Sequence, residues 1–276
     1  MKDLIRRAIT GAIYVAILVA CIFGGIYSFA CLFTLITIFC LWEFYGLVNM
    51  HEEVFVIKSL NVLSGAYLFI ATFLFIWKDI GFCIYLPYIL YILLVFILEM
   101  YRKKPNPVLN WAYSFLGQVY IALPIALLNR IAFFPDSNGV MSYIPLILFS
   151  LFVFIWVNDT GAYLLGVTFG KHRLFERISP KKSWEGFWGG LVLAILSSMI
   201  FGYFLPDVGY LHWAFLALLV VLAGTFGDLV ESMMKRTFNV KDSGNALPGH
   251  GGFLDRFDSM LFAIYAMFIY IEIVLR

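Results

Sequence analysis

Cations, carboxylates and glycines are concentrated in one stretch, residues 232–258, between two long apolar runs. Its residues with relevant chemistry are Lys235, Arg236, Lys241, Arg256, Asp242, Asp255, Asp258, Gly249, His250, Gly251 and Gly252. Lysine and arginine bind phosphate oxygens, aspartates supply the hard oxygen ligands that Mg²⁺ prefers, and glycines let backbone N–H groups approach an anion. The mixture predicts a site for a polyanionic ligand with a divalent metal ion, whereas a plain connecting loop has no need of it.

Acids within this stretch and just before it lie at the ends of apolar runs. Asp228, Glu231 and Lys235 stand at i, i+3 and i+7, which is one face of a helix, and Asp255 and Asp258 stand at i and i+3 of another. Two helix ends joined by a loop could place Asp228 opposite Asp255, as a metal site requires. The alternative is that the acids only pair with neighbouring cations, so that charge is tolerated at membrane depth.

A second basic motif, ISPKKSWEG (178–186), precedes another apolar run. Ser179 and Ser183 are candidate N-caps of the helix that follows. A helix N-terminus beside Lys181 and Lys182 is typical of an anion site, and either lysine is a candidate phosphate ligand. The alternative is ordinary anchoring of a membrane helix by cations and an interfacial tryptophan.

The composition identifies the chain as an integral membrane protein. Of its 276 residues, 63% are hydrophobic and 13% charged, against about half and a quarter in soluble domains. The net charge of +2 is too small to indicate a nucleic-acid partner. The four cysteines lie in apolar runs without a CxxC pair and are expected to be small core residues.

Nine apolar runs are long enough to cross a bilayer of about 30 Å, so an all-α, polytopic membrane fold is expected. They lie near residues 8–26, 28–48, 59–77, 80–99, 109–133, 142–166, 184–205, 211–230 and 253–274. The first run lacks a small-residue cleavage site and is expected to be a retained anchor. Pro87 and Pro124 predict kinks or local unwinding within their runs.

The cations predict the orientation. With a cytoplasmic N-terminus, most of the 19 lysines and arginines lie inside, and only Lys78, Arg130 and Arg276 lie outside, as the positive-inside rule requires. Both motif loops, residues 167–183 and 231–252, then lie at the cytoplasmic face of the inner membrane, where nucleotides are available.

The stretch 232–258 resembles the signature of the phosphatidate cytidylyltransferases, also called CDP-diacylglycerol synthases. The resemblance covers S-x-M-K-R, K-D-x-G and L-P-G-H-G-G-F-x-D-R-F-D, and extends to NDTGAY (158–163), ISPKKSWEG and GDLVES (227–232). It covers roughly the C-terminal half of the chain, whereas the N-terminal half shares only its apolar character and WEF (42–44). Asn158 stands where the family has a small residue, and Ser183 where it usually has threonine.

The resemblance implies transfer of the cytidylyl group of CTP to phosphatidate, which gives CDP-diacylglycerol and pyrophosphate in phospholipid biosynthesis. It implies CTP, phosphatidate and bilayer lipid as partners, and it leaves the oligomeric state, a homodimer included, open. It also implies Mg²⁺ on Asp228 and Asp255, and whether a monovalent cation joins it stays open. Residues 101–276 are expected to carry the catalytic site, and residues 1–100 to form packing helices or a peripheral bundle.

Motifs and resemblance together give the expected site. The catalytic set is Asp228, Asp255, Lys235 and Asp258. The substrate-binding set is Asp159, Lys181, Lys182, Ser183, Arg236, Lys241, Asp242, Gly249, His250, Gly251, Gly252 and Arg256. For His250, phosphate contact and a structural role both stay open, and Glu43 is expected to cap or hydrogen-bond within the bundle.

Three other functions compete with this interpretation. A CTP-dependent lipid kinase would use the same ligands but transfer the γ-phosphate. A secondary transporter would show inverted repeats and charges at mid-bilayer, whereas these charges gather at one face. A purely structural membrane protein would leave PGHGG (248–252) unexplained, and the lack of a GxxxxGK[ST] loop argues against familiar ATP chemistry.

Overall fold

The computed structural model describes residues 2–136, 138–244 and 251–276, with side chains described from residue 9 onwards. The chain divides into two compact units, which we call unit 1 (Met1–Tyr143 with Phe238–Arg256) and unit 2 (Ile144–Thr237 with Phe257–Arg276). Across the described residues, eight helical segments are long and apolar enough to span a membrane, and the first helix has a shorter apolar part, Ile9–Phe23. The predicted all-α polytopic fold is confirmed. The predicted division of roles at residue 100 stays a prediction.

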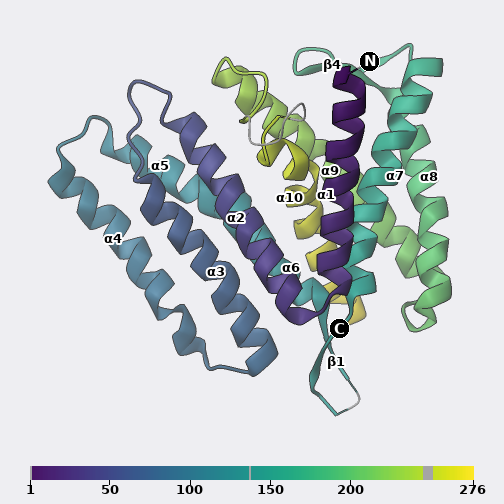
Figure 1. The fold of residues 1–276 in the computed structure, drawn as a ribbon, viewed down its shortest axis with the longest axis horizontal. Helices are drawn as coiled ribbons and strands as arrows, with labels where there is room; N and C mark the ends of the chain where they lie inside the picture. The colour runs from purple at the N-terminus through teal and green to yellow at the C-terminus, as the bar shows by residue number, and fades with distance from the viewer. Residues whose placement is uncertain (1, 137, 245–250) are drawn as a thin grey trace. The chain divides into compact units, whose positions relative to one another are not determined.

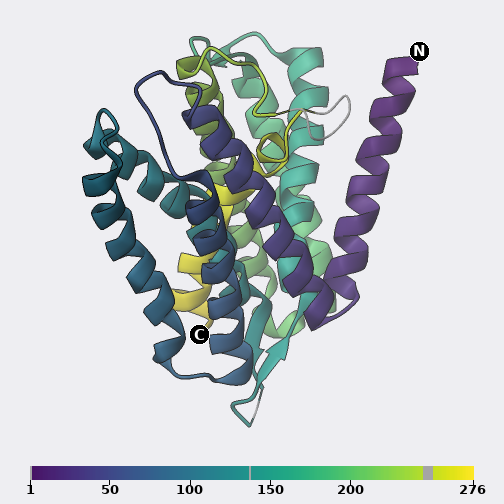
Figure 2. The ribbon, with the colours of Figure 1, turned by 60° about the vertical axis from the view of Figure 1, so that its left-hand side comes forward.

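Unit 1 consists of helices joined by short turns and one hairpin. They are α1 (Lys2–Phe23), α2 (Ile26–Val48), α3 (Lys58–Lys78), a 3₁₀ turn (Phe82–Tyr85), α4 (Leu86–Arg102), α5 (Pro107–Gly117), a π turn (Gln118–Ala122), α6 (Leu123–Ala132), β1 (Phe133–Pro135) and β2 (Met141–Tyr143). Helices α2 and α3 lie side by side (Figure 1). The chain reverses between α1 and α2 at Gly25, whose φ of +113° suits glycine (Figure 2).

The core of unit 1 is an aromatic cluster. Phe29, Phe33, Phe69 and Phe133 are all 0% exposed, and the ring centroids of Phe29 and Phe69 lie 5.9 Å apart. Tilted and edge-on ring pairs of this kind add to the free energy gained by burying the rings. The cluster fixes α2 and α3 against the β1–β2 hairpin, and so it holds the helix that carries Glu43.

A buried polar network marks the π turn of unit 1. The Gln118 amide donates to the Asn61 carbonyl oxygen at 2.8 Å and to the Tyr45 hydroxyl at 3.1 Å. Pro124 lies two residues after the end of the π turn and has no N–H to donate, so the predicted local unwinding near Pro124 is confirmed. Pro87 instead lies in the first turn of α4, where helices tolerate proline without a kink.

Unit 2 consists of four long helices and a second hairpin. They are α7 (Pro145–Phe169), β3 (Arg173–Phe175), β4 (Ser179–Ser183), α8 (Trp184–Phe204), a 3₁₀ turn (Pro206–Val208), α9 (Tyr210–Thr237) and α10 (Leu254–Tyr270), which ends in a π turn (Ile271–Leu275). The chain enters α10 in unit 1 and passes to unit 2 after Arg256. Neither short hairpin was predicted from the sequence.

Small residues allow α7 and α8 to pack closely side by side (Figure 1). A Cβ atom at Gly190 would lie 2.6 Å from the Asn158 carbonyl oxygen, and one at Gly186 would lie 2.6 Å from the Ala162 carbonyl oxygen. Such contact between backbones is typical of membrane helices, which cannot rely on the hydrophobic effect to associate. The close packing fixes the start of α8, and with it the β3–β4 hairpin that carries the predicted phosphate ligands.

Candidate functional site

An ion pair between Lys182 and Asp228 joins two of the predicted motifs in unit 2. Lys182 lies near the end of β4 and Asp228 in α9, and their side chains are 30% and 29% exposed. The Ser232 hydroxyl, one helical turn after Asp228, donates to Asp228 Oδ1 at 3.2 Å. The structure therefore brings together a predicted metal ligand and a predicted phosphate ligand.

A second ion pair lies along the same helix. Lys235 pairs with Glu231 at i, i+4, and their side chains are 16% and 2% exposed. The contacts Asp228–Ser232 and Glu231–Lys235 agree with the predicted polar face of α9. For Glu231, the structure supports the alternative that the acid neutralises a neighbouring lysine.

Asp258 lies beside Asp228 because α9 and α10 approach closely. A Cβ atom at Gly227 would lie 2.7 Å from the Asp258 carbonyl oxygen, so any side chain there would force the two helices apart. Asp258 Oδ1 accepts the Ser259 N–H at 2.6 Å, and its charge interacts with those of Asp228, Asp159 and Lys235. Carboxylates repel one another at this range, and a cation that bound between them would relieve the repulsion.

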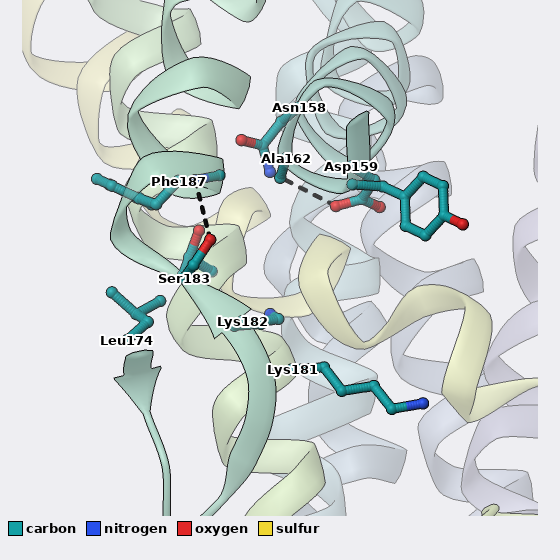
Figure 3. Close-up of a pocket in the computed structure, with 11 residues that line it drawn as sticks. Asn158, Asp159, Ala162, Leu174, Lys181, Lys182, Ser183 and Phe187 are labelled. Carbon is teal, nitrogen blue, oxygen red and sulfur yellow. Dashed lines mark hydrogen bonds between the residues drawn. The ribbon is translucent and has the colours of Figure 1, made fainter. Parts of the chain in front are cut away.

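A cavity of about 230 Å³ opens next to these charges, entirely within unit 2. It is lined by Asn158, Asp159, Ala162, Tyr163, Leu174, Lys181, Lys182, Ser183, Gly186, Phe187 and Thr225. Figure 3 shows Asn158 and Asp159 projecting from α7, and Lys181 extended with its ammonium group away from Ser183. Asn158 Oδ1 is buried there without a hydrogen-bond partner among the described residues. The cavity thus combines cations, an acid and an unsatisfied acceptor with apolar walls.

Ser183 caps α8, as predicted, because its hydroxyl accepts the Gly186 N–H at 3.2 Å. The prediction of a second cap at Ser179 is wrong, because Ser179 begins strand β4. Sequence reasoning also missed Glu185, whose carboxylate accepts the backbone N–H groups of Lys171 and His172 and contacts the His172 ring at 2.6 Å. Glu185 therefore anchors the turn between α7 and the β3–β4 hairpin.

The signature segment of unit 1 is organised around Asp255. Its Oδ2 atom accepts the N–H groups of Ser243 at 2.9 Å and Gly252 at 2.8 Å. Gly251 has a φ of +82°, and a Cβ atom there would lie 2.7 Å from Asp255 Oδ2. The glycines do permit close approach to an anion, and in the described residues that anion is the chain's own carboxylate.

The remaining predicted residues are placed as follows. Exposed residues are Asp159, Lys181, Arg236, Lys241, Asp242 and Arg256. Gly249 and His250 lie outside the described residues. Glu43, near the end of α2, accepts the Leu254 N–H at 2.9 Å, so its predicted hydrogen-bonding role within the bundle is confirmed.

The donor set of unit 2 fits a magnesium ion that arrives with a nucleotide. Among the residues that the structure describes, no group of three or more histidine, cysteine or acidic side chains could hold a metal by itself. Mg²⁺ bound to nucleotides commonly uses one or two carboxylates and takes its other ligands from phosphate and water. Asp228 and Asp258 meet that smaller requirement. Pairing of Asp228 with Asp255 joins residues of different units and stays a prediction.

Fold and site together define a class: an integral membrane protein whose polar site combines lysines with aspartates beside a cavity in a helical bundle. The sequence profile of the Cytidylyltransferase family matches residues 5–274, and the chain belongs to this family. The family expected from the signature stretch is thereby confirmed.

Named relatives agree with this membership. Over 156 residues the chain is 42% identical to the phosphatidate cytidylyltransferase of Staphylococcus epidermidis, a match that covers 55% of this chain and 58% of the relative. Over 134 residues it is 45% identical to that of Bacillus subtilis, covering 48% of this chain and 49% of the relative. These matches span only about half the length of the curated relatives.

Proposed function

We propose that the chain transfers the cytidylyl group of CTP to phosphatidate, with release of pyrophosphate. The observation that carries the proposal is the contact of Lys182 with Asp228, beside Asp258 and the cavity of unit 2. It brings three signature segments, from the β3–β4 hairpin, α9 and α10, to one place in unit 2. Family membership and the names of the relatives support the same reaction.

In the proposed reaction, an oxygen of the phosphatidate phosphate attacks the α-phosphorus of CTP. The bond from that phosphorus to the oxygen that bridges it to the β-phosphate breaks, and pyrophosphate leaves with the bond's electron pair. A phosphate monoester with a second pKa near 6 is already largely dianionic at neutral pH, so no residue has to remove a proton. The protein's tasks are therefore to align the two phosphates and to neutralise charge.

The described residues match those tasks. We propose that Lys181, Lys182 and Lys235 bind phosphate oxygens, with Arg236, Lys241 and Arg256 as further cations of the signature. We propose Asp228 and Asp255 as the residues that would hold Mg²⁺, with Asp258 beside Asp228, and the ion would neutralise charge on the nucleotide phosphates. Before substrate binds, the ion pair compensates the charges of Lys182 and Asp228. In the proposed complex, Lys182 would instead bind a phosphate and Asp228 a cation.

We also propose that this site lies at the cytoplasmic face of the membrane. The β3–β4 hairpin next to the cavity, with the turn that precedes it, carries a group of exposed cations, Lys171, Arg173, Arg177 and Lys181. The positive-inside rule predicts that such a group lies in the cytoplasm. Transfer of phosphatidate from the bilayer to water is unfavourable, since exposing its acyl chains costs about 0.8 kcal/mol per CH₂ group. A site at this border can receive a lipid from the bilayer and a nucleotide from solution.

The test is a labelling experiment with purified protein, phosphatidate and Mg²⁺. CTP labelled at the α-phosphate should label the extracted lipid, and CTP labelled at the γ-phosphate should not. Label from the γ-phosphate alone would instead identify a lipid kinase. Absence of both labels from the lipid, in protein that is folded, would overturn the proposed function.

A pair of matched variants tests the placement of the site. Asp228→Asn should abolish Mg²⁺-dependent labelling, because it removes a charge that we assign to metal binding. Asp207→Asn makes the same change at an exposed position in the 3₁₀ turn between α8 and α9, and it should leave labelling unchanged. Full activity of Asp228→Asn would refute the assignment of Asp228.

A further inference from the structure

Glu43 of α2 binds two points of the signature segment within unit 1. Its Oε2 atom accepts the Ser243 hydroxyl at 3.0 Å and the Leu254 N–H at 2.9 Å. These partners lie 200 and 211 residues further along the chain. Leu254 is the first residue of α10, where backbone N–H groups have no partner within the helix. Glu43 thus caps α10 from a different helix.

Glu43 and Asp255 hold Ser243 from two sides. Glu43 accepts the Ser243 hydroxyl, while Asp255 Oδ2 accepts the Ser243 N–H at 2.9 Å and the Gly252 N–H at 2.8 Å. Ser243 is 5% exposed, so neither bond competes freely with water. The position of the Asp255 carboxylate therefore depends on a loop that Glu43 fixes.

Two glycines make room for the Glu43 carboxylate. A Cβ atom at Gly252 would lie 2.3 Å from Glu43 Oε2 and 2.2 Å from the Ser243 hydroxyl oxygen. A Cβ atom at Gly244 would lie 2.6 Å from Glu43 Oε1. Each distance is too short for any side chain, so both segments approach the carboxylate with their backbone.

Both hydrogen bonds to Glu43 end on the same carboxylate oxygen, Oε2. Glu43 Oε1 is buried and has no hydrogen-bond partner among the described residues. Burying such an oxygen without a partner is unfavourable. The charge of Lys58 interacts with that of Glu43 and offsets part of this cost. The Lys58 ammonium lies 3.8 Å from the centroid of the Trp42 ring. Hydrogen bonds to an ionised acceptor are about twice as strong as neutral ones, which favours a role in holding the loop firmly.

We propose that Glu43 is a positioning residue for the proposed reaction: it fixes Ser243 and the start of α10, and so fixes the carboxylate of Asp255. The inference rests on the proposed function, in which Asp255 belongs to the site. Glu43 itself touches neither substrate nor metal. Its loss leaves Asp255 chemically intact but held by a loosened loop.

Hydrogen exchange of the full-length protein separates positioning from simple capping. In Glu43→Ala, the Leu254 amide loses its acceptor directly, so its exchange should accelerate about tenfold, as expected for a lost hydrogen bond to a charged group. The amides of Ser243 and Gly252 are bound by Asp255 and not by Glu43. If Glu43 positions the loop, their exchange also accelerates; if only Leu254 responds, the inference is overturned.

Kinetics in the same protein provide the second readout. Glu43→Ala and the milder Ser243→Ala should both raise the Mg²⁺ concentration for half-maximal lipid labelling, with little change in the KM for CTP, and Glu43→Asp should partly restore the wild-type value. Glu272→Ala is the matched control and should leave the Mg²⁺ dependence unchanged, because Glu272 pairs with Arg276 at 2.6 Å in the last turns of unit 2. Unchanged Mg²⁺ dependence in Ser243→Ala and Glu43→Ala would overturn the inference.

The two proposals fail in distinguishable ways. If wild-type protein labels no lipid, the proposed function fails, and the exchange data still report whether Glu43 holds the loop. If wild-type protein is active and the Glu43 variants match it in both exchange and Mg²⁺ dependence, only the positioning role fails.

Discussion

Substitution of Gly227 by alanine tests whether the close approach of α9 and α10 is needed for activity. The new Cβ atom would lie 2.7 Å from the Asp258 carbonyl oxygen and 3.1 Å from the Phe262 Cβ atom. An ordinary contact begins near 3.4 Å, so the helices must separate by about 0.7 Å. The atom in the way belongs to the backbone, and therefore α10 has to move as a body at Asp258.

We expect Gly227→Ala to lower activity strongly in protein that still folds. Overpacking lowers the free energy of unfolding by about 1–3 kcal/mol, and replacing glycine by alanine within a helix raises it by about 0.5–1 kcal/mol. The net loss of stability is therefore at most about 2.5 kcal/mol. Misplacement of a site by about 1 Å can lower a rate about a hundredfold. We therefore expect labelling of lipid from α-labelled CTP to fall about ten- to a hundredfold in folded protein.

Gly224 provides the matched control on the same face of α9. A Cβ atom at Gly224 would lie 3.4 Å from the Ser259 carbonyl oxygen, an ordinary contact. Gly224→Ala should keep wild-type activity and should unfold at the same or a slightly higher temperature. Wild-type activity in Gly227→Ala, or equal losses in both variants, would refute the claim that the spacing of Asp228 and Asp258 depends on Gly227.

Two further predictions concern the β3–β4 hairpin and the start of α8. Lys182→Ala should raise the KM for CTP at saturating lipid about tenfold or more, because it removes a charged donor that we assign to a CTP phosphate. The exposed Lys181→Ala should have a smaller effect, and equal effects would contradict the assignment of the lysine that pairs with Asp228 as the stronger phosphate ligand. Ser183→Ala removes the cap that accepts the Gly186 N–H and should lower the free energy of unfolding by about 1 kcal/mol. Ser183→Thr should keep the cap and the wild-type stability. Equal melting temperatures for the two variants would contradict the stabilising role of the cap.

The helices were predictable because their signal is local. Each membrane-spanning segment is a long apolar run, and the i, i+4 pair of Glu231 with Lys235 follows from helical periodicity alone. Strands β1 and β3 have three residues each, which is too short for a period of two to be recognised. Ser179 was wrongly predicted to be a cap because the strand that it begins, β4, was not recognised in the sequence.

Contacts between distant segments were beyond the reach of the sequence. Helical spacing predicted that Asp228 shares one face of its helix with Glu231 and Lys235, but it did not indicate that Lys182 would meet Asp228. Glu43 shows the same limit, since its partners lie about two hundred residues away and its own motif, WEF, carries little information. These pairings depend on how segments far apart in the sequence pack against each other, which the local pattern of residues does not reveal.

Glycines of the site also have a packing role, because they permit close contact between segments of the chain. Gly251 and Gly252 were predicted to present backbone N–H groups to a phosphate. In the structure these two glycines, and Gly227 outside that stretch, allow segments of the chain to approach each other: Gly227 faces the Asp258 carbonyl, Gly251 faces Asp255, and Gly252 faces Glu43. Ionised side chains near a bilayer are costly unless other groups stabilise them. Backbone that comes this close provides such stabilisation. The N–H groups of Ser243 and Gly252 donate to Asp255, and the N–H group of Leu254 donates to Glu43. A side chain at Gly227 or Gly252 should therefore damage the site without touching a substrate.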